Sequence, residues 1–328
     1  MNKLAVVALG GNALLRENQA GTIEEQEQNT TDTLENLVFL INQGYDLVIT
    51  HGNGPQVGNI LMRNDAGEQT YHIPQMPIDI CVADSQGGIG YMIERMMRNV
   101  LIKHNVDKEI VTLVTAVVVA ENDPAFQNPT KRIGKIYSHD QANQLTIDKG
   151  WTFKKEIKTA GGWRRVVPSP SPVQIINENV IKTLARQGVI TIAVGGGGIP
   201  VYFDAEGKVR AAEAVIDKDL ASSLLAGRVG AEEFYILTDV PFIYKNYKRP
   251  DQETLEFLNY ADTKKYLEAG EFSEGSMAPK IRACLQFLEH GGQKAVITEA
   301  FKLEDKSYGS KITMDYDPVD MAKYQQKT

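Results

Sequence analysis

Apolar and polar positions along the chain follow two alternating patterns. Continuous apolar runs, typical of buried strands, predict strands at residues 4–9, 47–50, 111–120, 189–194, 234–237 and 295–298. Between them apolar residues recur every three or four positions, as at Leu34, Leu37, Val38 and Ile41, and this spacing predicts amphipathic helices. Similar helical faces are expected at 89–97, 180–185, 221–225 and 281–288. The alternation predicts an α/β fold, a three-layer α/β/α sandwich around a mostly parallel open sheet.

Four of these predicted strands are followed directly by a loop that is rich in glycine or carries an acidic residue. The loops are residues 10–13, 51–58, 195–200 and 238–241. In parallel α/β sheets ligands bind outside the carboxyl ends of the strands, so we expect the four loops to border one crevice. Glycine lets backbone N–H groups approach an anion closely. For the run Gly195–Gly198 the alternative is a plain flexible turn.

One segment, residues 123–172, interrupts the alternation. It contains five prolines, both tryptophans and many basic residues, and it shows no long helical period. A structureless loop of this length is improbable in a compact domain. We therefore expect an inserted small subdomain that closes as a lid, in which 163–167 forms one arm of a hairpin. The alternative is a surface decoration without a role in closure.

Composition narrows the function classes. The chain of 328 residues carries a net charge of −7, which gives no support to a nucleic-acid or membrane partner. Its two cysteines, Cys81 and Cys284, form no CxxC pair, so a zinc cluster is not expected and a reducing compartment is. The longest apolar stretch, 111–120, is too short to span a bilayer, and no signal sequence is expected. We expect a cytoplasmic protein.

The glycine spacing matches two familiar nucleotide motifs poorly. Gly52, Gly54 and Gly58 approach the dinucleotide pattern G-x-G-x-x-G, but the third glycine comes one position late. A dinucleotide-dependent oxidoreductase therefore stays a minor alternative. The phosphate-binding pattern GxxxxGK[ST] does not occur in the sequence. The five histidines are scattered, and His51, beside a glycine loop, is interpreted as structural.

Two lysines lie at predicted helix starts, where a cation opposes the helix dipole. Lys218 stands between Asp217 and Asp219 before an apolar helical stretch. Lys280 follows Ser276, a predicted N-cap, within the first turn of another helix. A phosphate bound at these helix ends would favour both lysines, and one aspartate would hold an ammonium in place. The alternative for the first cluster is a solvated group of surface charges.

Several segments together resemble one known family. LGGNA near the start, HGNGPQVG, DPAFQNPTK, VPSP, GGGGIPV, AVIDKDLA, TDV and GSMAPK are similar to the carbamate kinases, a branch of the amino acid kinase superfamily. The resemblance runs from about residue 7 to 298. It implies the reaction ATP + carbamate = ADP + carbamoyl phosphate, which we expect to form ATP in arginine or agmatine catabolism. It also implies a homodimer and Mg²⁺ carried on the nucleotide phosphates, with no direct protein ligand.

The resemblance further implies roles for individual residues. Lys218 and Lys280 would stabilise the transition state, Asp217 or Asp219 would orient a lysine, and Lys131 would reach the substrate on closure. The residues expected to hold carbamate and the transferred phosphoryl group are Gly10, Gly11, Asn12, Gly52, Asn53, Gly54, Gly195 and Gly196. The nucleotide site is expected to use Thr238, Asp239, Tyr244, Gly275, Met277 and Lys280.

The resemblance also implies one domain with two lobes, a substrate lobe over 1–210, which includes the 123–172 insertion, and a nucleotide lobe over 211–328. Arg132, Asp84 and Gly88 depart from the family pattern and bear on lid geometry and substrate affinity. The main alternative is another acyl-phosphate-forming kinase, such as acetylglutamate or glutamate kinase. A longer substrate would need an arginine clamp, and the sequence shows no obvious one.

Overall fold

The computed structural model describes residues 2–16, 19–156, 161–305 and 307–316, and its centre is an eight-stranded sheet. The strands stand in the order β15 (Phe257–Asn259), β17 (Ser310–Thr313), β16 (Lys294–Thr298), β12 (Glu233–Leu237), β1 (Lys3–Leu9), β2 (Tyr45–His51), β9 (Ile190–Ile192) and β3 (Ile110–Thr112). All neighbours pair in parallel except β16 and β17. The carboxyl ends of β1, β2 and β12 therefore meet at one edge.

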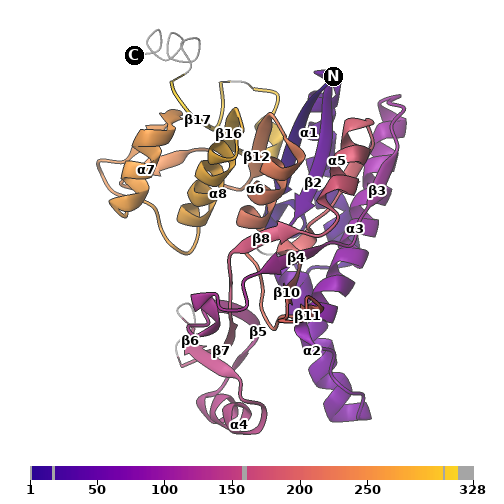
Figure 1. The fold of residues 1–328 in the computed structure, drawn as a ribbon, viewed down its shortest axis with the longest axis vertical. Coiled ribbons are helices and arrows are strands. Elements are labelled where there is room, and N and C mark those ends of the chain that lie inside the picture. The colour runs from indigo at the N-terminus through magenta and orange to yellow at the C-terminus, as the bar shows by residue number, and fades with distance from the viewer. Residues whose placement is uncertain (1, 17–18, 157–160, 306, 317–328) are drawn as a thin grey trace.

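Helices cover both faces of this sheet (Figure 1). The described helices are α1 (Ile23–Asn42), α2 (Gly54–Tyr71), α3 (Ile78–Lys103), α4 (His139–Lys149), α5 (Glu178–Arg186), α6 (Lys218–Val229), α7 (Tyr260–Glu268) and α8 (Met277–Glu289). Of these, α4 lies in the 123–172 insertion and not on the central sheet. One apolar cluster joins alternate residues of β1 to α1 and α3, and the other joins the remaining residues of β1 to α5, α6 and α8. The predicted three-layer sandwich with a mostly parallel sheet is confirmed.

Residues 111–120, expected as one strand, form two strands in different sheets. β3 belongs to the central sheet, whereas β4 (Ala116–Val119) lies in a second sheet with β8 (Pro172–Ile175), β10 (Ile199–Phe203) and β11 (Val209–Ala211). The buried side chain of Gln86 separates the two strands: it accepts from the N–H of Thr115 at 2.7 Å and donates to its carbonyl at 3.1 Å. The single predicted strand was wrong because apolar content alone does not mark such a break.

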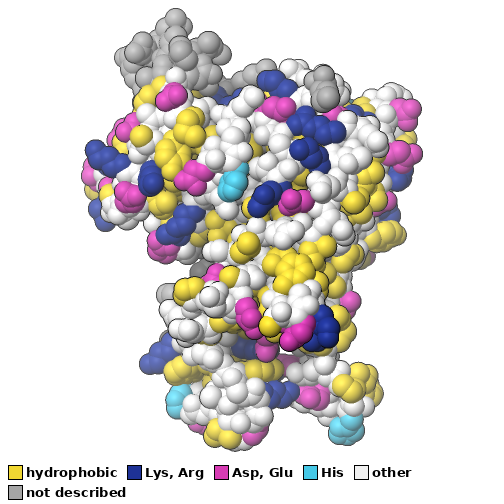
Figure 2. Space-filling model, viewed as in Figure 1, with side chains coloured by type: hydrophobic (Ala, Val, Ile, Leu, Met, Phe, Trp, Pro, Cys, Tyr) yellow, Lys and Arg dark blue, Asp and Glu magenta, His cyan; other side chains and the backbone are white. Residues whose placement is uncertain are grey.

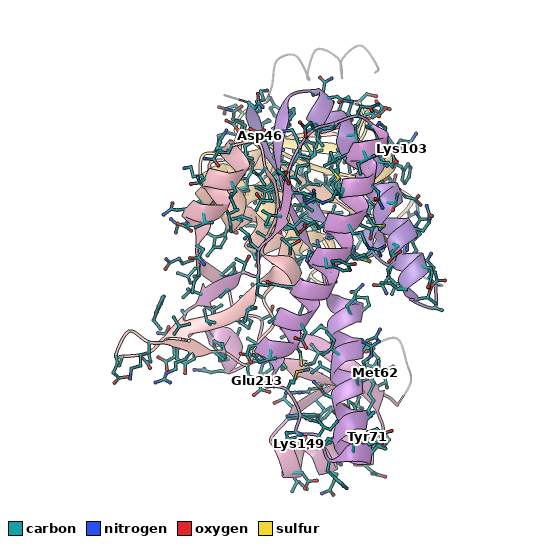
Figure 3. All side chains as sticks on the ribbon, turned by 90° about the vertical axis from the view of Figure 1, so that its right-hand side faces the viewer. Asp46, Met62, Tyr71, Lys103, Lys149 and Glu213 are labelled. Carbon is teal, nitrogen blue, oxygen red and sulfur yellow. The ribbon has the colours of Figure 1, made fainter. Side chains whose placement is uncertain are left out.

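The 123–172 segment contains its own small sheet of β5 (Lys131–Tyr137), β7 (Trp163–Val167) and β6 (Thr152–Lys155). It also contains α4, which the sequence analysis missed although Ser138 and Gln141 form a capping box and Gly150 ends the helix. The small sheet lies beside α2 at the lower end of the molecule (Figures 1 and 3). Lys149 pairs with Glu68 of α2 at 2.7 Å.

On the face drawn in Figure 2, basic and acidic side chains are interspersed.

The remaining described elements are a hairpin and four short 3₁₀ helices. The hairpin is formed by β13 (Ile243–Lys245) and β14 (Glu253–Leu255), and the 3₁₀ helices are η1 (Gly11–Ala13), η2 (Pro124–Phe126), η3 (Gly195–Gly197) and η4 (Ala300–Lys302). Among the described residues, no helix is long and apolar enough to cross a membrane.

Candidate active site

The four loops predicted to share a crevice border one cavity of about 1290 Å³. Each loop except the third follows its strand directly, and the third follows β9 after two further residues. Of the residues named from the sequence, the cavity is lined by Gly10, Gly11, Gly52, Asn53, Gly54, Lys131, Gly196, Asp217, Lys218, Asp219, Thr238, Asp239, Gly275 and Lys280. Parallel strand order explains the convergence, because all four loops leave the sheet at the same edge.

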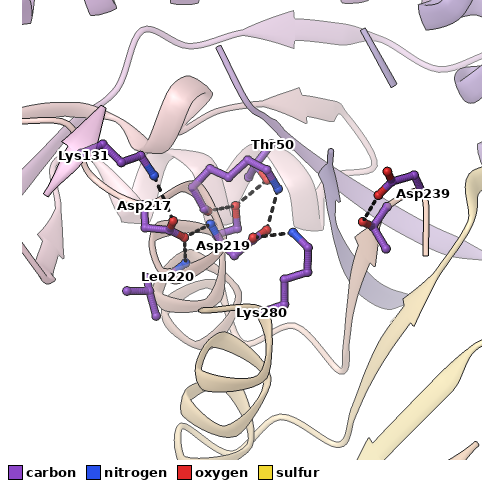
Figure 4. Close-up of polar contacts among 10 residues, drawn as sticks. Thr50, Lys131, Asp217, Asp219, Leu220, Asp239 and Lys280 are labelled. Carbon is purple, nitrogen blue, oxygen red and sulfur yellow. Dashed lines mark hydrogen bonds and ion pairs between the residues drawn. The ribbon is translucent and has the colours of Figure 1, made fainter. Parts of the chain in front are cut away.

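At the floor of the cavity Asp219 holds two lysines. Lys218 Nζ lies 2.6 Å from Asp219 Oδ1, and Lys280 Nζ lies 2.9 Å from Oδ2 of the same carboxylate (Figure 4). Lys218 is the first residue of α6 and Lys280 lies in the first turn of α8, so both ammonium groups stand at helix N-termini. The positive ends of two helices and two cations thus face one point, an arrangement suited to an anion.

Burial makes this cluster electrostatically strong. Asp219 is buried, yet its pKa is lowered, because attraction to Lys218 and Lys280 outweighs the cost of desolvating the carboxylate. The pKa of Lys218 is also lowered, chiefly by burial, which the pull of Asp219 opposes and repulsion from Lys280 reinforces. Two cations share one carboxylate, so the cluster keeps one excess positive charge that water screens little.

Asp217 connects the cluster to the insertion. It is the N-cap of α6, where its side chain accepts from the backbone N–H groups of Asp219 at 2.9 Å and Leu220 at 3.4 Å. Its other oxygen lies 3.2 Å from Nζ of Lys131, the first residue of β5. The sequence left open which of the two aspartates would orient a lysine. In the structure Asp219 orients the two buried lysines, and Asp217 holds the lysine of the insertion.

Two glycines bring the loops close together. Gly10 donates to the carbonyl of Leu237 at 2.9 Å, and a side chain added at Gly10 would place its Cβ 2.5 Å from that oxygen. Gly196 has a φ of +67°, and an added Cβ would lie 2.2 Å from Nδ2 of Asn53. The expected role of the Gly195–Gly198 run was close approach to a ligand, with a flexible turn as the alternative. The structure adds a third reason, because these buried glycines are packed against other loops.

Some residues named from the sequence lie away from the cavity. Gly195 is buried behind it and its carbonyl accepts from Gln86 at 2.9 Å. Tyr244 stacks on Tyr247, with ring centroids 5.6 Å apart, and Met277 packs against the apolar core. The cavity lining includes neither residue. Asn12 lies in η1, and its side chain is outside the described part of the structure.

The N-cap prediction at Ser276 was partly wrong. Ser276 does occupy the N-cap position of α8, but its side chain makes no capping hydrogen bond. Its hydroxyl contacts that of Ser273 instead. The carbonyl of Ser273 accepts from the backbone N–H of Ala278 at 3.0 Å, and Pro279 in this first turn has no N–H to be capped.

Two buried polar residues of α3 position the loops, and the sequence analysis assigned neither of them this work. Ser85 accepts from Asn53 Nδ2 at 2.8 Å, and Gln86 fixes both Thr115 and Gly195. Polar side chains on the otherwise apolar face of α3 were the available signal. His51, expected to be structural, is buried, and burial lowers its pKa to about 4. Its Nδ1 lies 2.9 Å from the Gly52 carbonyl, so the neutral ring donates from Nδ1.

The cavity is more basic than the chain as a whole. Its lining contains six basic residues, Arg16, Lys131, Arg132, Arg164, Lys218 and Lys280, against Asp217, Asp219, Asp239 and Glu299. Sequence reasoning missed Arg16 and Arg164, which come from separate segments. In the described residues no group of three or more His, Cys, Asp or Glu side chains is arranged to hold a metal ion. The lining suits an anionic ligand despite the net charge of −7.

Comparisons with known proteins agree with this geometry. The model of the amino acid kinase family matches residues 3–299. The carbamate kinase of Pyrococcus furiosus is 46% identical over 92% of this chain and 95% of its own length. That of Thermococcus kodakarensis is 48% identical over 90% of this chain and 93% of its own. A solved structure of carbamate kinase from Giardia lamblia bound to AMP-PNP has a TM-score of 0.90 and 38% identity, covering 96% of this chain and 99% of that one.

Proposed function

The chain belongs to the amino acid kinase family, with carbamate kinases as its similar relatives, and we propose that it transfers a phosphoryl group between ATP and carbamate. The reaction is ATP + carbamate = ADP + carbamoyl phosphate. The observation that carries this proposal is the buried Lys218–Asp219–Lys280 cluster at the floor of a cavity lined by glycine loops. Such a cluster offsets negative charge on a transferring phosphoryl group.

The proposed chemistry needs positioning and charge neutralisation more than a base. A carbamate oxygen is already anionic, so it attacks the γ-phosphorus without losing a proton, while the bond from that phosphorus to the leaving ADP oxygen breaks. Lys218 and Lys280 would stabilise the charge on the transferring group from two directions. The backbone N–H of Gly11 would hold the small substrate, which has no side chain to be recognised. The N–H groups of Gly10 and Gly52 already donate to the carbonyls of Leu237 and Leu9, so these two glycines would contribute space rather than donors.

The nucleotide would lie toward the side of the cavity formed by Thr238, Asp239 and Gly275. The carbamate kinase from Giardia lamblia is bound to AMP-PNP, an ATP analogue, which supports a nucleotide as one ligand of this family. Mg²⁺ remains part of the proposal, as a partner of the nucleotide phosphates. Both oxygens of Asp219 already accept from lysines, which leaves this carboxylate poorly disposed to bind a cation directly. When bound, Mg²⁺ would neutralise phosphate charge.

The remaining parts of the proposal concern the enzyme in the cell. We place it in the cytoplasm, where its two free, buried cysteines stay reduced, and in arginine or agmatine catabolism, where it would form ATP. We also propose a homodimer. The edge of the central sheet at β3 and the neighbouring surface expose Tyr91, Ile102 and Val114, which are 59% or more accessible, and an apolar edge of this kind suits a second copy.

The substrate can be tested in the ATP-consuming direction. We expect ADP release with ammonium and bicarbonate, which supply carbamate, and none above background with N-acetylglutamate or glutamate. The variant Lys280→Ala, purified in parallel with the wild type, is the control for contaminating kinases. A contaminant would give the same rate in both preparations, whereas the protein's own activity must fall in the variant. Turnover of an amino acid in preference to carbamate would replace this proposal with the other acyl-phosphate-forming kinases.

A further inference from the structure

Asn53 lines the crevice, and its side-chain amide has one paired atom and one unpaired atom. Its Nδ2 donates to Ser85 Oγ at 2.8 Å. Its Oδ1 accepts from no group in the described part of the structure, yet that oxygen is not sealed from solvent. Asn53 as a whole is only 4% exposed, and it meets solvent at the crevice that it lines. An acceptor without a partner therefore faces the ligand space.

Ser85 decides which end of this amide faces the crevice. Its hydroxyl donates its proton to the carbonyl of Val82 at 2.6 Å, so its oxygen can only accept from Asn53. The amide nitrogen must therefore point to Ser85, and the amide oxygen is turned away from it. The face of the amide lies on Gly196, where an added Cβ would be 2.2 Å from Nδ2 and 2.8 Å from Oδ1. One hydrogen bond and one close contact thus hold the amide in a single orientation.

The place of Asn53 in the chain offers its oxygen another use, which it does not take. Asn53 is the N-cap of α2, where an asparagine oxygen usually accepts from a backbone N–H of the first turn. Its side chain makes no capping hydrogen bond, and Pro55 in this first turn has no N–H to offer. The unpaired oxygen therefore has no role at the helix end.

The same oxygen belongs to a loop that adjoins the lysine cluster. Gly52, the residue before Asn53, packs on the stem of Lys218, where an added Cβ would lie 3.1 Å from Cδ. Carbamate carries two N–H donors, whereas acetate has the same shape with a methyl group in place of the nitrogen. An amide oxygen can accept from carbamate and gains no hydrogen bond from acetate. A site that pairs a substrate N–H discriminates against an analogue without it, because its own polar group is then left unpaired.

We propose that Asn53 Oδ1 accepts an N–H of carbamate, and that Ser85 is the positioning residue that turns this oxygen toward the crevice. The inference rests on the proposed phosphoryl transfer, since it concerns which acyl group the same site accepts. Ser85 itself does not line the crevice, so it acts through Asn53. The lysine cluster, by contrast, acts on the phosphoryl group, which carbamoyl phosphate and acetyl phosphate share.

The test compares carbamoyl phosphate with acetyl phosphate as phosphoryl donors to ADP, in the wild type and in Ser85→Ala. We expect kcat/KM for carbamoyl phosphate to fall about tenfold, the effect of losing one hydrogen bond, and kcat/KM for acetyl phosphate to change less than about twofold. The change in the ratio of the two values cancels the different intrinsic reactivity of the compounds. Equal falls for both donors would make Ser85 merely structural and overturn the proposal.

Ser223→Ala is the matched control. Ser223 is buried like Ser85, and its hydroxyl also donates to a backbone carbonyl, that of Ala283 in α8, at 2.6 Å. Ser223→Ala therefore loses a similar internal hydrogen bond without touching Asn53. Its ratio of kcat/KM values should equal that of the wild type, and a fall as large as that in Ser85→Ala would also overturn the proposal.

Binding gives a second readout that needs no turnover. Phosphonoacetamide and acetonylphosphonate differ only in an amide NH₂ against a methyl group. In isothermal titration calorimetry the wild type should prefer the amide about tenfold or more, and both Ser85→Ala and Asn53→Ala should lose this preference. Absence of the preference in the wild type, or its retention in Asn53→Ala, would overturn the proposal. A wild type that prefers the amide but forms no ATP from carbamoyl phosphate would support the nitrogen contact and refute the proposed reaction.

Discussion

At the scale of single residues, Asp219 is the group that brings the ammonium groups of Lys218 and Lys280 together. It precedes Lys280 by 61 residues in the chain, yet each of its oxygens accepts from a different ammonium group. The sequence identified both lysines by their position at helix starts. It could not show which aspartate would pair with them, because Asp217 and Asp219 both adjoin Lys218 in the sequence. Their side-chain rotamers and burial are set only by the fold.

The first prediction concerns Lys280. Lys280→Ala should lower kcat by around 10²–10³, because one preorganised cation is lost from the transition state, an effect of about 2.7–4 kcal/mol. Steady-state kinetics with carbamoyl phosphate and ADP measure it, and the ADP dissociation constant should change much less. Unchanged turnover, or a loss confined to the KM for nucleotide, would remove Lys280 from the transition state.

The second prediction concerns pH. The pKa of Lys218 is lowered by burial, so kcat/KM should decline on the alkaline side below the ordinary lysine range as the ammonium deprotonates. Asp219 raises that pKa, so Asp219→Asn should lower it further and move the alkaline decline to lower pH. The pH profile of kcat/KM for both proteins checks this. An alkaline limb that stays in place or moves upward would mean that another group titrates.

The third prediction concerns Gly196. Gly196→Ala should destabilise the protein by roughly 2–5 kcal/mol, because positive φ and overpacking both add strain. The clash is with Asn53, which cannot move aside freely because it is buried and donates to Ser85. Gly207→Ala is the matched control. Its φ is +75° but an added Cβ meets nothing within 4 Å, so the loss should be about 1–2 kcal/mol. Urea unfolding measures the free energy of unfolding of both variants. Equal losses for Gly196→Ala and Gly207→Ala would exclude a packing role for Gly196.

At the scale of elements, the sequence predicted the central strands and helices because burial on both faces leaves continuous apolar runs. It failed where a polar contact decides the path, as at Thr115, where Gln86 ends one strand and starts another. It also missed α4, whose helical period is weak because a single residue, Ala142, is buried. Residues that position loops through buried hydrogen bonds, such as Ser85 and Gln86, leave a fainter signal than residues that face the ligand.

The inserted segment gives the fourth prediction. Lys131 of β5 contacts Asp217 across the crevice, and the insertion is also held to α2, where Tyr137 donates to Asp65 at 3.3 Å. We expect β5 and β7 to exchange amide hydrogens faster in the free enzyme than with both ligands bound. Lys131→Ala should weaken use of carbamoyl phosphate more than binding of ADP.

Hydrogen exchange with and without ligands, followed by mass spectrometry, decides whether the insertion acts as a lid. Lys154→Ala is a matched control on the same small sheet, because its ammonium group contacts Asn128 rather than the cluster. Equal protection in both states, together with a Lys131→Ala variant that behaves like Lys154→Ala, would make the insertion a rigid decoration.

At the scale of the whole molecule, parallel topology explains how distant segments make one site. The strands β1, β2, β9 and β12 send their loops to one edge, and the helices that follow or approach that edge bring Lys218 and Lys280 to it. The division into a substrate lobe over 1–210 and a nucleotide lobe over 211–328 stays a prediction. Its ranges include residues outside the described structure, namely 1, 17–18, 157–160, 306 and 317–328.

We propose above all that this crevice catalyses phosphoryl transfer between carbamoyl phosphate and ADP. The most direct test follows the purified protein by ³¹P NMR with carbamoyl phosphate, ADP and Mg²⁺. We predict that the carbamoyl phosphate signal declines as the three ATP signals appear in equal amount, and that Lys280→Ala slows this exchange by around 10²–10³. Folded wild-type protein that leaves ADP unchanged, or that forms ATP equally well after Lys280→Ala, would contradict the account.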